Sequence, residues 1–140
     1  MTEKIQIRRM IDGDLHFILA TWLKSFRASG DIPRRIRDSD FFPIYEPFLK
    51  ELINKSDTHV ACLADDWDVI AGFMTSEQTG LDTLIHYCFV KEAWRKMGIA
   101  RLLLDNVQKS PSVYFTHWTS PIESISHKLD ARYNPYRLFR

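Results

Sequence analysis

The sequence predicts an α/β fold with a mixed β-sheet, in the element order β-α-α-β-β-β-α-β-α-β, in a single domain over residues 1–140. Apolar residues recur at helical spacing in several segments, and β-type runs separated by short turns occupy the middle of the chain. Three sequential strands joined by tight turns should pair antiparallel, whereas a later strand–helix–strand unit should form a right-handed parallel crossover. Helices should therefore cover both faces of a mixed sheet.

Length and composition are those of one globular domain. The chain has 140 residues, of which 45% are hydrophobic and 26% charged, enough for a packed core. A net charge of +1 gives no reason to expect nucleic acid or a membrane as partner, and no apolar run approaches the roughly 20 residues of a membrane span. The N-terminus lacks the apolar core of a secretory signal. Because Cys62 and Cys88 have no metal-ligand spacing, we expect a cytoplasmic protein with reduced core thiols and no metal site.

The first half of the chain predicts one strand and two helices. Ile5–Arg8 alternates apolar and polar residues, as a half-buried strand does. Asp12-Gly13-Asp14 starts a helix that should run to about Arg27, because carboxylates are favoured at a helix N-terminus. Residues 31–42 should be irregular, and a second helix should follow Pro43. Three arginines in the irregular segment would either recognise an acidic group or face solvent: Arg34, Arg35 and Arg37.

Strands should follow the second helix. His59–Ala64 and Val69–Ser76 are β-rich runs joined by an acidic turn, and Gly72 predicts a bulge or a close backbone approach in the second run. A turn at Gln78–Gly80 should lead to a third strand, Thr83–Val90.

The rest of the chain predicts two more helices and two more strands. Ile99–Gln108 is amphipathic, and Val113–Trp118 is β-rich. Ser120 should cap a helix that reaches about Leu129, with Pro121 in the first position and Glu123 closing a capping box. Tyr136–Phe139 is predicted as a last short strand.

The stretch Val90–Ala100 joins a predicted strand to a predicted helix through a loop with two cations and a glycine. The first backbone N–H groups of a helix have no intrahelical partner, and the macrodipole places partial positive charge there. Arg95 and Lys96 add full charge, and Gly98 allows a ligand to approach the backbone closely. The stretch therefore predicts an anion site of the kind that binds phosphate groups.

The same stretch resembles the coenzyme A pyrophosphate loop of the GNAT N-acetyltransferase superfamily. The pattern Arg95-x-x-Gly98-x-Ala100, five residues beyond Val90, matches the family motif V-x-P-x-x-R-x-x-G-I-G/A, with Glu92 in place of the proline. The predicted element order is also that of the GNAT fold, over essentially the whole chain. The resemblance implies a GNAT-like fold and transfer of an acetyl group from acetyl-CoA to a primary amine of a small molecule or a protein.

The resemblance also implies where acetyl-CoA lies. The pyrophosphate would sit on the backbone of the loop, and the pantetheine arm would pair with the preceding strand, where a backbone N–H polarises the thioester carbonyl. The cofactor-binding residues that this implies are Cys88, Phe89, Val90, Arg95, Lys96, Met97, Gly98, Ile99 and Ala100. The strand residues among them would equally suit a central strand without a ligand.

An acceptor amine must lose a proton before it attacks, so a base is expected in direct contact or through water. Even-numbered residues from Asp82 to Cys88 should share one face of their strand, where Asp82 and His86 are the ionisable members. Glu77, at the end of the preceding strand, is a third candidate. Each of these would otherwise be a turn carboxylate or a hydrogen-bonded strand histidine.

In the GNAT family a tyrosine near the last helix often protonates the leaving thiolate, and Tyr133 is the matching candidate. Leu138 replaces the glycine of that family pattern, and Tyr133 lies one residue out of step. These departures leave open a catalytically decayed module that binds CoA or a protein partner. A separate alternative is an interaction domain in which Arg95 and Lys96 bind an acidic partner and no nucleotide is bound. The sequence does not identify the acceptor, and we expect a monomer or a homodimer.

Overall fold

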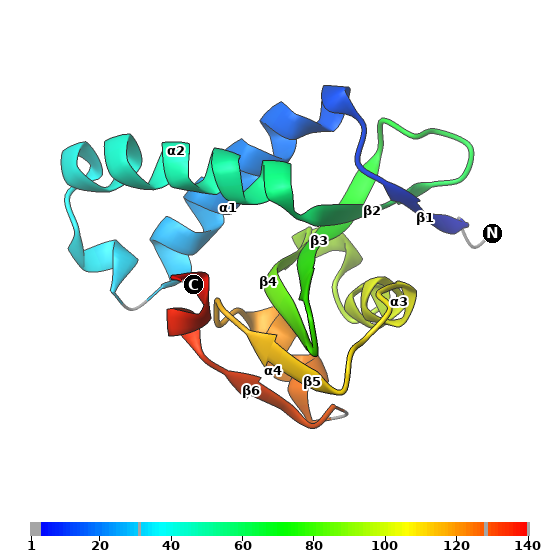
Figure 1. Cartoon of the computed structure of the whole chain (residues 1–140). Coiled ribbons are helices and arrows are strands. Elements are labelled where there is room, and N and C mark those ends of the chain that lie inside the picture. Colours follow the sequence, from blue (N-terminus) through cyan, green and yellow to red (C-terminus); the bar gives the residue numbers. More distant parts are fainter. Residues whose placement is uncertain (1–3, 31, 128, 140) are drawn as a thin grey trace.

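A six-stranded mixed sheet forms the centre of the protein in the computed structural model, which describes residues 4–30, 32–127 and 129–139 (Figure 1). The strands lie side by side in chain order. Pairing is antiparallel from β1 to β4 and parallel from β4 to β6, so the predicted mixed sheet is confirmed. The strands are β1 (Ile5–Arg9), β2 (Asp57–Leu63), β3 (Ile70–Thr79), β4 (Asp82–Val90), β5 (Ser112–Phe115) and β6 (Ala131–Tyr133).

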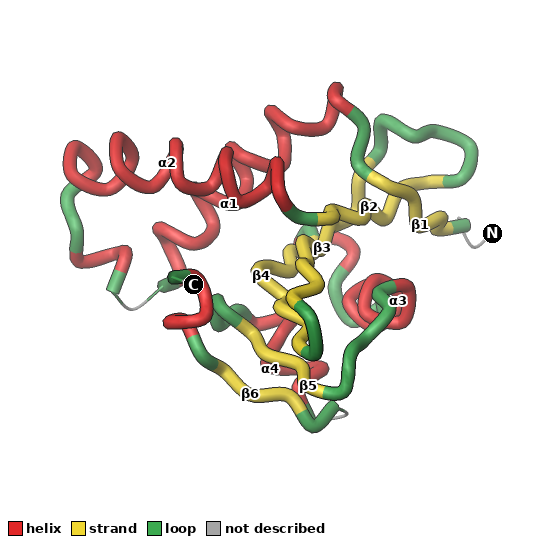
Figure 2. Tube along the Cα trace, viewed as in Figure 1, coloured by secondary structure: helices red, strands yellow, loops and turns green. Residues whose placement is uncertain are grey.

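Helices cover both faces of this sheet, with strands as the middle layer (Figure 2). The pair α1 (Leu15–Ser29) and α2 (Asp38–Lys55) packs on one face, and α3 (Ile99–Asn106) and α4 (Ser120–Ser126) pack on the other. Within the described part of the chain, no helix is long and apolar enough to cross a membrane.

The two faces of the sheet have cores of different composition. The core under α1 and α2 is rich in aromatic side chains, with Trp22 stacked on Tyr87 at a ring distance of 4.7 Å. The core under α3 and α4 is mainly aliphatic, and includes Ile85, Ile99 and Leu103. We call them the aromatic core and the aliphatic core.

A bulge in β4 breaks the strand alternation at His86. Thr75 of β3 pairs with Tyr87 and Ser76 pairs with Ile85, so His86 is an extra residue on β4. Ile85 and Cys88 both belong to the aliphatic core, whereas Tyr87 belongs to the aromatic core. The prediction that even-numbered residues as far as Cys88 share one face is therefore wrong.

The second helix begins earlier than predicted. α2 starts at Asp38 and contains Pro43 and Pro47, although prolines cost helix hydrogen bonds. Phe41 is buried and lies 5.1 Å from Tyr45 between ring centroids, one helical turn away. Helical packing of these aromatic side chains therefore continues through the proline.

The C-terminal part also differs from the prediction. Thr119, and not Ser120, caps α4, because its Oγ1 accepts the N–H of Ile122 at 3.3 Å, and the helix ends at Ser126. The last strand is β6, before the segment predicted, and Pro135–Leu138 is a 3₁₀ helix. Pro135 cannot donate to a ladder, and the side chain of Asn134 accepts the N–H of Tyr136 at 3.1 Å.

Other element boundaries move by a few residues. β3 extends to Thr79, so the turn predicted at Gln78–Gly80 lies at Gly80 and Leu81. β5 ends at Phe115, before the predicted end at Trp118. The close approach predicted at Gly72 is confirmed, because a Cβ atom there would overlap the carbonyl oxygen of Phe89.

Candidate active site

The loop between β4 and α3 has a tightly specified backbone. A short 3₁₀ helix, Glu92–Trp94, follows Val90, and then Lys96 and Gly98 adopt left-handed φ values of 65° and 77°. Glycine occupies such conformations without steric cost. Arg95 Nε donates to the carbonyl of Val90 at 3.1 Å and ties the loop to the end of β4.

The start of α3 presents free backbone donors. The first intrahelical bond runs from Leu102 N to the carbonyl of Gly98 at 3.0 Å. The N–H groups of Ile99, Ala100 and Arg101 therefore have no acceptor within the helix. Together with the helix dipole they favour an anion at this end.

A cleft of about 360 Å³ lies beside this helix start, between α3 and α4. We call it the α3–α4 cleft. Its described lining includes Arg95, Lys96 and Arg101 but no carboxylate, and residues of α4 such as Ser120 and Pro121 form the opposite wall. Its charge and its free backbone donors both suit an anionic ligand.

Six of the nine residues predicted to bind cofactor line the α3–α4 cleft: Val90, Arg95, Lys96, Gly98, Ile99 and Ala100. The other three lie elsewhere. Cys88 is buried in the aliphatic core, where burial raises the pKa of its thiol to about 12. Phe89 packs on the opposite face, 5.8 Å from Phe73 between ring centroids, and Met97 is exposed.

Sequence reasoning missed the wall formed by α4. Ser120 and Pro121 follow Gly98 by more than 20 residues, and no local pattern connects the two segments. Arg101 could have been predicted, because a cation in the first turn of a helix that follows such a loop lies near the same group of backbone donors.

Strands β4 and β5 are paired over only part of their length. Their ladder runs from Asp82 opposite Ser112 to Ile85 opposite Phe115, and Thr116 N adds a last bond to the carbonyl of Ile85 at 3.1 Å. Beyond this point the end of β4 has no ladder with β5. The continuation of β5, residues 116–118, instead lines a second cleft.

The second cleft has a volume of about 570 Å³ and is built from distant segments. We call it the aromatic cleft. The end of α1, the α1–α2 connection, the first half of α2, residues 116–118 and the C-terminal segment contribute side chains to it. Asp40 is the one described lining residue that carries a carboxylate, and the predicted arginine cluster does not line the cleft.

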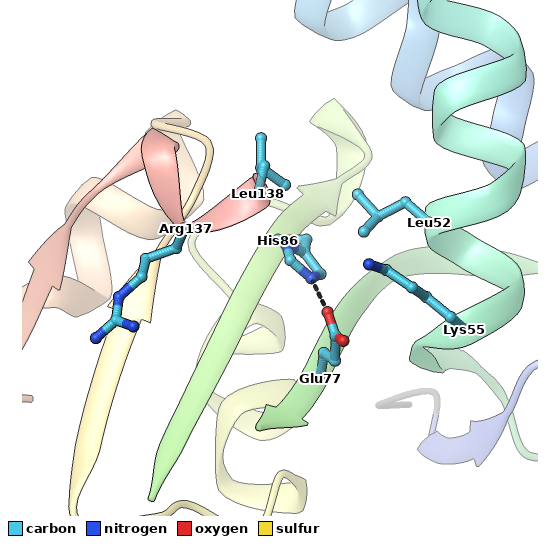
Figure 3. A pocket seen from close by; sticks show the side chains of 6 residues that line it. All are labelled: Leu52, Lys55, Glu77, His86, Arg137 and Leu138. Atoms are coloured by element: carbon cyan, nitrogen blue, oxygen red, sulfur yellow. Dashed lines mark hydrogen bonds and ion pairs between the residues drawn. The ribbon is translucent and has the colours of Figure 1, made fainter. Parts of the chain in front are cut away.

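The four candidate acid–base residues occupy three different places. Tyr133 lines the aromatic cleft, half-exposed, with its ring 5.6 Å from that of Trp118. His86 is buried, and its Nε2 lies 3.0 Å from Oε1 of Glu77 (Figure 3). Asp82 lies outside both clefts, 3.0 Å from Arg137. The structure thus joins Glu77 to His86 and separates them from the other two.

Two ionisable residues that the sequence did not indicate lie at the aromatic cleft. His117 Nε2 is hydrogen-bonded to the hydroxyl of Tyr45, and both residues line the cleft. Burial lowers the pKa of His117 to about 3, and burial also raises the pKa of Tyr45. Both are therefore neutral near pH 7.

The fold and the loop define a mixed-sheet protein in which backbone donors and three cations line a cleft at a strand–loop–helix junction. A model of the acetyltransferase (GNAT) family matches residues 20–110. Because this match covers more than half of the chain, the protein belongs to the GNAT acetyltransferase family. The matched region includes the Gly98 loop and α3 and ends before β5.

Solved structures share this fold at low sequence identity. A protein of Pyrococcus furiosus has a TM-score of 0.68 at 12% identity, over 89% of this chain and 91% of its own. A GNAT-family acetyltransferase from Staphylococcus aureus has a TM-score of 0.60 at 17% identity, over 91% and 81%. The aminoglycoside N-acetyltransferase AAC(6')-Iy in complex with CoA has a TM-score of 0.56 at 17% identity, over 91% and 85%. No curated protein sequence matches the chain.

Proposed function

We propose that the protein is an N-acetyltransferase that moves an acetyl group from acetyl-CoA to a primary amine. The observation that supports this most directly is the α3–α4 cleft, where a left-handed glycine, unpaired helix N–H groups and three cations surround one space. Apart from the adjoining residues of the chain, no atom lies within 4 Å of the position that a Cβ on Gly98 would occupy, so the space beside the backbone is open. Membership of the GNAT family supports the same proposal.

The residues present fit the pyrophosphate of coenzyme A. In this proposal the backbone from Arg95 to Ala100 holds the phosphates, and Arg95, Lys96 and Arg101 supply charge. The end of β4 from Cys88 to Val90, which pairs with β3 but has no ladder with β5, guides the rest of the molecule through backbone groups. When bound, acetyl-CoA supplies the acetyl group as a thioester. Cys88 and Phe89 therefore contribute through their backbone, because their side chains face the two cores.

We place the acceptor in the aromatic cleft and infer that it is an amine on an apolar body. The lining is dominated by aromatic and aliphatic side chains, and among its described residues Asp40 is the group that suits an ammonium ion. Tyr133 remains the proposed proton donor, because it lines the cleft, whereas the neighbouring Tyr136 does not. We assign no catalytic role to Asp82, because it pairs with Arg137 outside the clefts.

The test of the cofactor site is a calorimetric titration with acetyl-CoA that compares Gly98→Ala with Gly80→Ala. Both glycines have positive φ, 77° and 66°, and open space around a Cβ, so both variants should lose about 1–2 kcal/mol of stability. Only Gly98 lies in the α3–α4 cleft, so only Gly98→Ala should weaken binding, by about tenfold. Absence of binding to the unchanged protein at millimolar acetyl-CoA would overturn the proposal.

The acceptor class is tested separately, by measuring CoA release with a panel of amines. 2-Phenylethylamine and tryptamine should react with a higher kcat/KM than spermidine or a free amino acid, because the lining offers one described carboxylate and much apolar surface. A preference for polycationic or anionic acceptors would contradict this assignment.

A further inference from the structure

A continuous chain of hydrogen-bonded side chains connects β3 to the aromatic cleft. Glu77 Oε1 lies 3.0 Å from His86 Nε2, and His86 Nδ1 lies 2.8 Å from Thr116 Oγ1. The same hydroxyl lies 3.1 Å from His117 Nδ1, and His117 Nε2 is bonded to the hydroxyl of Tyr45. Five side chains from four segments thus form one path through the protein.

The bonding capacity of these groups gives the path a direction. A neutral imidazole donates from one nitrogen and accepts at the other, and a carboxylate only accepts. A neutral His86 would donate from Nε2 to Glu77 and would accept the Thr116 hydroxyl proton at Nδ1. Thr116 in turn accepts from His117 Nδ1, and His117 Nε2 accepts from Tyr45. Every donor in the path points toward Glu77.

The two ends of the path lie in different surroundings. Tyr45 and His117 line the aromatic cleft, where we place the acceptor. The side chain of Glu77 is 16% exposed at the other end, beside a small cavity that Lys55 of α2 and Arg137 also line (Figure 3). Between the ends, His86, Thr116 and His117 are almost fully buried. The path therefore connects the proposed acceptor site with a partly exposed carboxylate.

We propose that Glu77 takes up the proton of the acceptor amine through Tyr45, His117, Thr116 and His86. This inference rests on the proposed acetyltransferase function. The substrate N–H bond breaks and a bond to Tyr45 Oη forms, while each group passes its own proton to the next. The last transfer breaks the Nε2–H bond of His86 and forms an O–H bond on Glu77. An ammonium ion and a carboxylate become an amine and a carboxylic acid, and no electrons change hands.

A relay explains how a buried, neutral histidine can serve a base-dependent reaction. Burial disfavours a cationic His117, so His117 alone is a poor final acceptor for a proton. In the relay both imidazoles only exchange one neutral tautomer for the other, and the charge change occurs at Glu77. Tyr45 is the group that touches substrate, and the remaining members act through it.

Thr116→Val and Thr116→Ser provide a matched test of the path. Valine has the shape of threonine without the hydroxyl, whereas serine keeps the hydroxyl. With acetyl-CoA and 2-phenylethylamine, Thr116→Val should lower kcat about 100-fold near pH 7 with little change in KM for acetyl-CoA. Thr116→Ser should recover most of this lost kcat, because it keeps the hydroxyl. Glu77→Gln should behave like Thr116→Val, because an amide accepts the His86 bond but cannot take up the proton.

The pH profile separates a proton path from a purely structural role. As the pH rises toward the pKa of the free amine, the acceptor arrives already deprotonated, so the deficit of Thr116→Val should shrink. A deficit that is equal at all pH values, or a Thr116→Val variant as active as Thr116→Ser, would overturn the relay. If the unchanged protein bound acetyl-CoA but acetylated no amine, the acetyltransferase function and the relay would both be overturned.

A second measurement does not depend on activity. The ¹⁵N chemical shifts of the imidazoles should show His86 protonated at Nε2 and His117 protonated at Nδ1 near pH 7. Protonation of His117 at Nε2 would reverse its bond with Tyr45 and would overturn the proposed direction. In Thr116→Val the His117 Nδ1–H loses its acceptor, so its signal should shift, while the signals of the exposed His16 should not.

Discussion

The two faces of the sheet carry ion pairs that differ in burial. Under α1 and α2, Arg8 and Asp14 form a buried ion pair at 2.7 Å with side chains only 6% and 9% exposed, and the hydrogen-bonded histidines lie on the same side of the sheet. On α3 the ion pair between Arg101 and Asp105 lies at the surface, with side chains 52% and 65% exposed. The anion site that we propose on that face includes the backbone N–H groups at the start of α3.

This contrast shows two ways of building a functional surface. A backbone site needs only the right loop conformation, so a short sequence motif identifies it. A site made of buried side chains needs residues from distant segments of the chain, because buried polar groups must form hydrogen bonds with one another. The first kind suits binding of a fixed anionic group, and the second suits the transfer of protons under control of the local environment.

The largest expected effect tests the buried ion pair against the exposed one. Arg8→Met leaves Asp14 as an uncompensated buried charge, so it should lower the free energy of unfolding by about 3–5 kcal/mol. Arg8 also donates to the carbonyl of Trp67 at 3.0 Å, and this bond is lost too. Arg101→Met on α3 should cost at most about 0.5 kcal/mol. Urea unfolding of both variants measures the difference, and similar losses would show that the contrast is wrong.

Low pH should lower the free energy of unfolding, because it protonates Asp14 in the ion pair with Arg8. Burial opposes ionisation of Asp14, but hydrogen bonds from Arg8 and from the N–H of Ile11 outweigh it and lower its pKa below the ordinary 3.8. The stability from this carboxylate is therefore complete above about pH 4 and is lost as the pH falls through the lower, folded-state pKa. Unfolding measured from pH 7 to pH 2 should show this loss. The double variant Arg8→Met/Asp14→Leu should show a smaller loss, and an unchanged acid dependence would contradict the assignment.

The smallest effect concerns the cap of α4, next to the α3–α4 cleft. Thr119→Ala should cost about 1 kcal/mol, because it removes the acceptor for the N–H of Ile122. Ser120→Ala is the control, since Ser120 is already the first helical residue and accepts no capping bond. Thermal unfolding of the two variants decides between them. A larger loss of stability for Ser120→Ala would show that Ser120 is the cap, as the sequence alone predicts.

The sequence predicted the mixed sheet and most elements because hydrophobic periodicity and turn residues are local signals. It also predicted the loop around Gly98 because a left-handed position in a βα connection strongly favours glycine. The predicted cap of α4, Ser120, is one residue too late. Thr119 and Ser120 are both good capping residues, and proline is tolerated at either of the first two helical positions. Local propensity does not distinguish these two starts.

The aromatic cleft and the proposed relay could not be predicted from local sequence patterns. Tyr45 and His117 are 72 residues apart, and neither belongs to a motif. The bulge at His86 involves no glycine or proline, so nothing in β4 indicated that His86 and Cys88 would separate. For the start of α2, a local signal was present but misleading. Pro43 predicts a helix boundary, but burial of Phe41 favours a helix that begins before it.

The prolines inside α2 make one wall of the aromatic cleft compliant. Pro43 and Pro47 have no N–H, so the carbonyls of Ser39 and Pro43 lack the partners four residues later that stiffen a regular helix. This half of α2 supplies Phe41 and Tyr45 to the cleft. Local opening requires least free energy where backbone hydrogen bonds are fewest. We therefore expect the aromatic cleft to widen for larger ligands at α2, whereas α3, beside the α3–α4 cleft, contains no proline and keeps its regular hydrogen bonds.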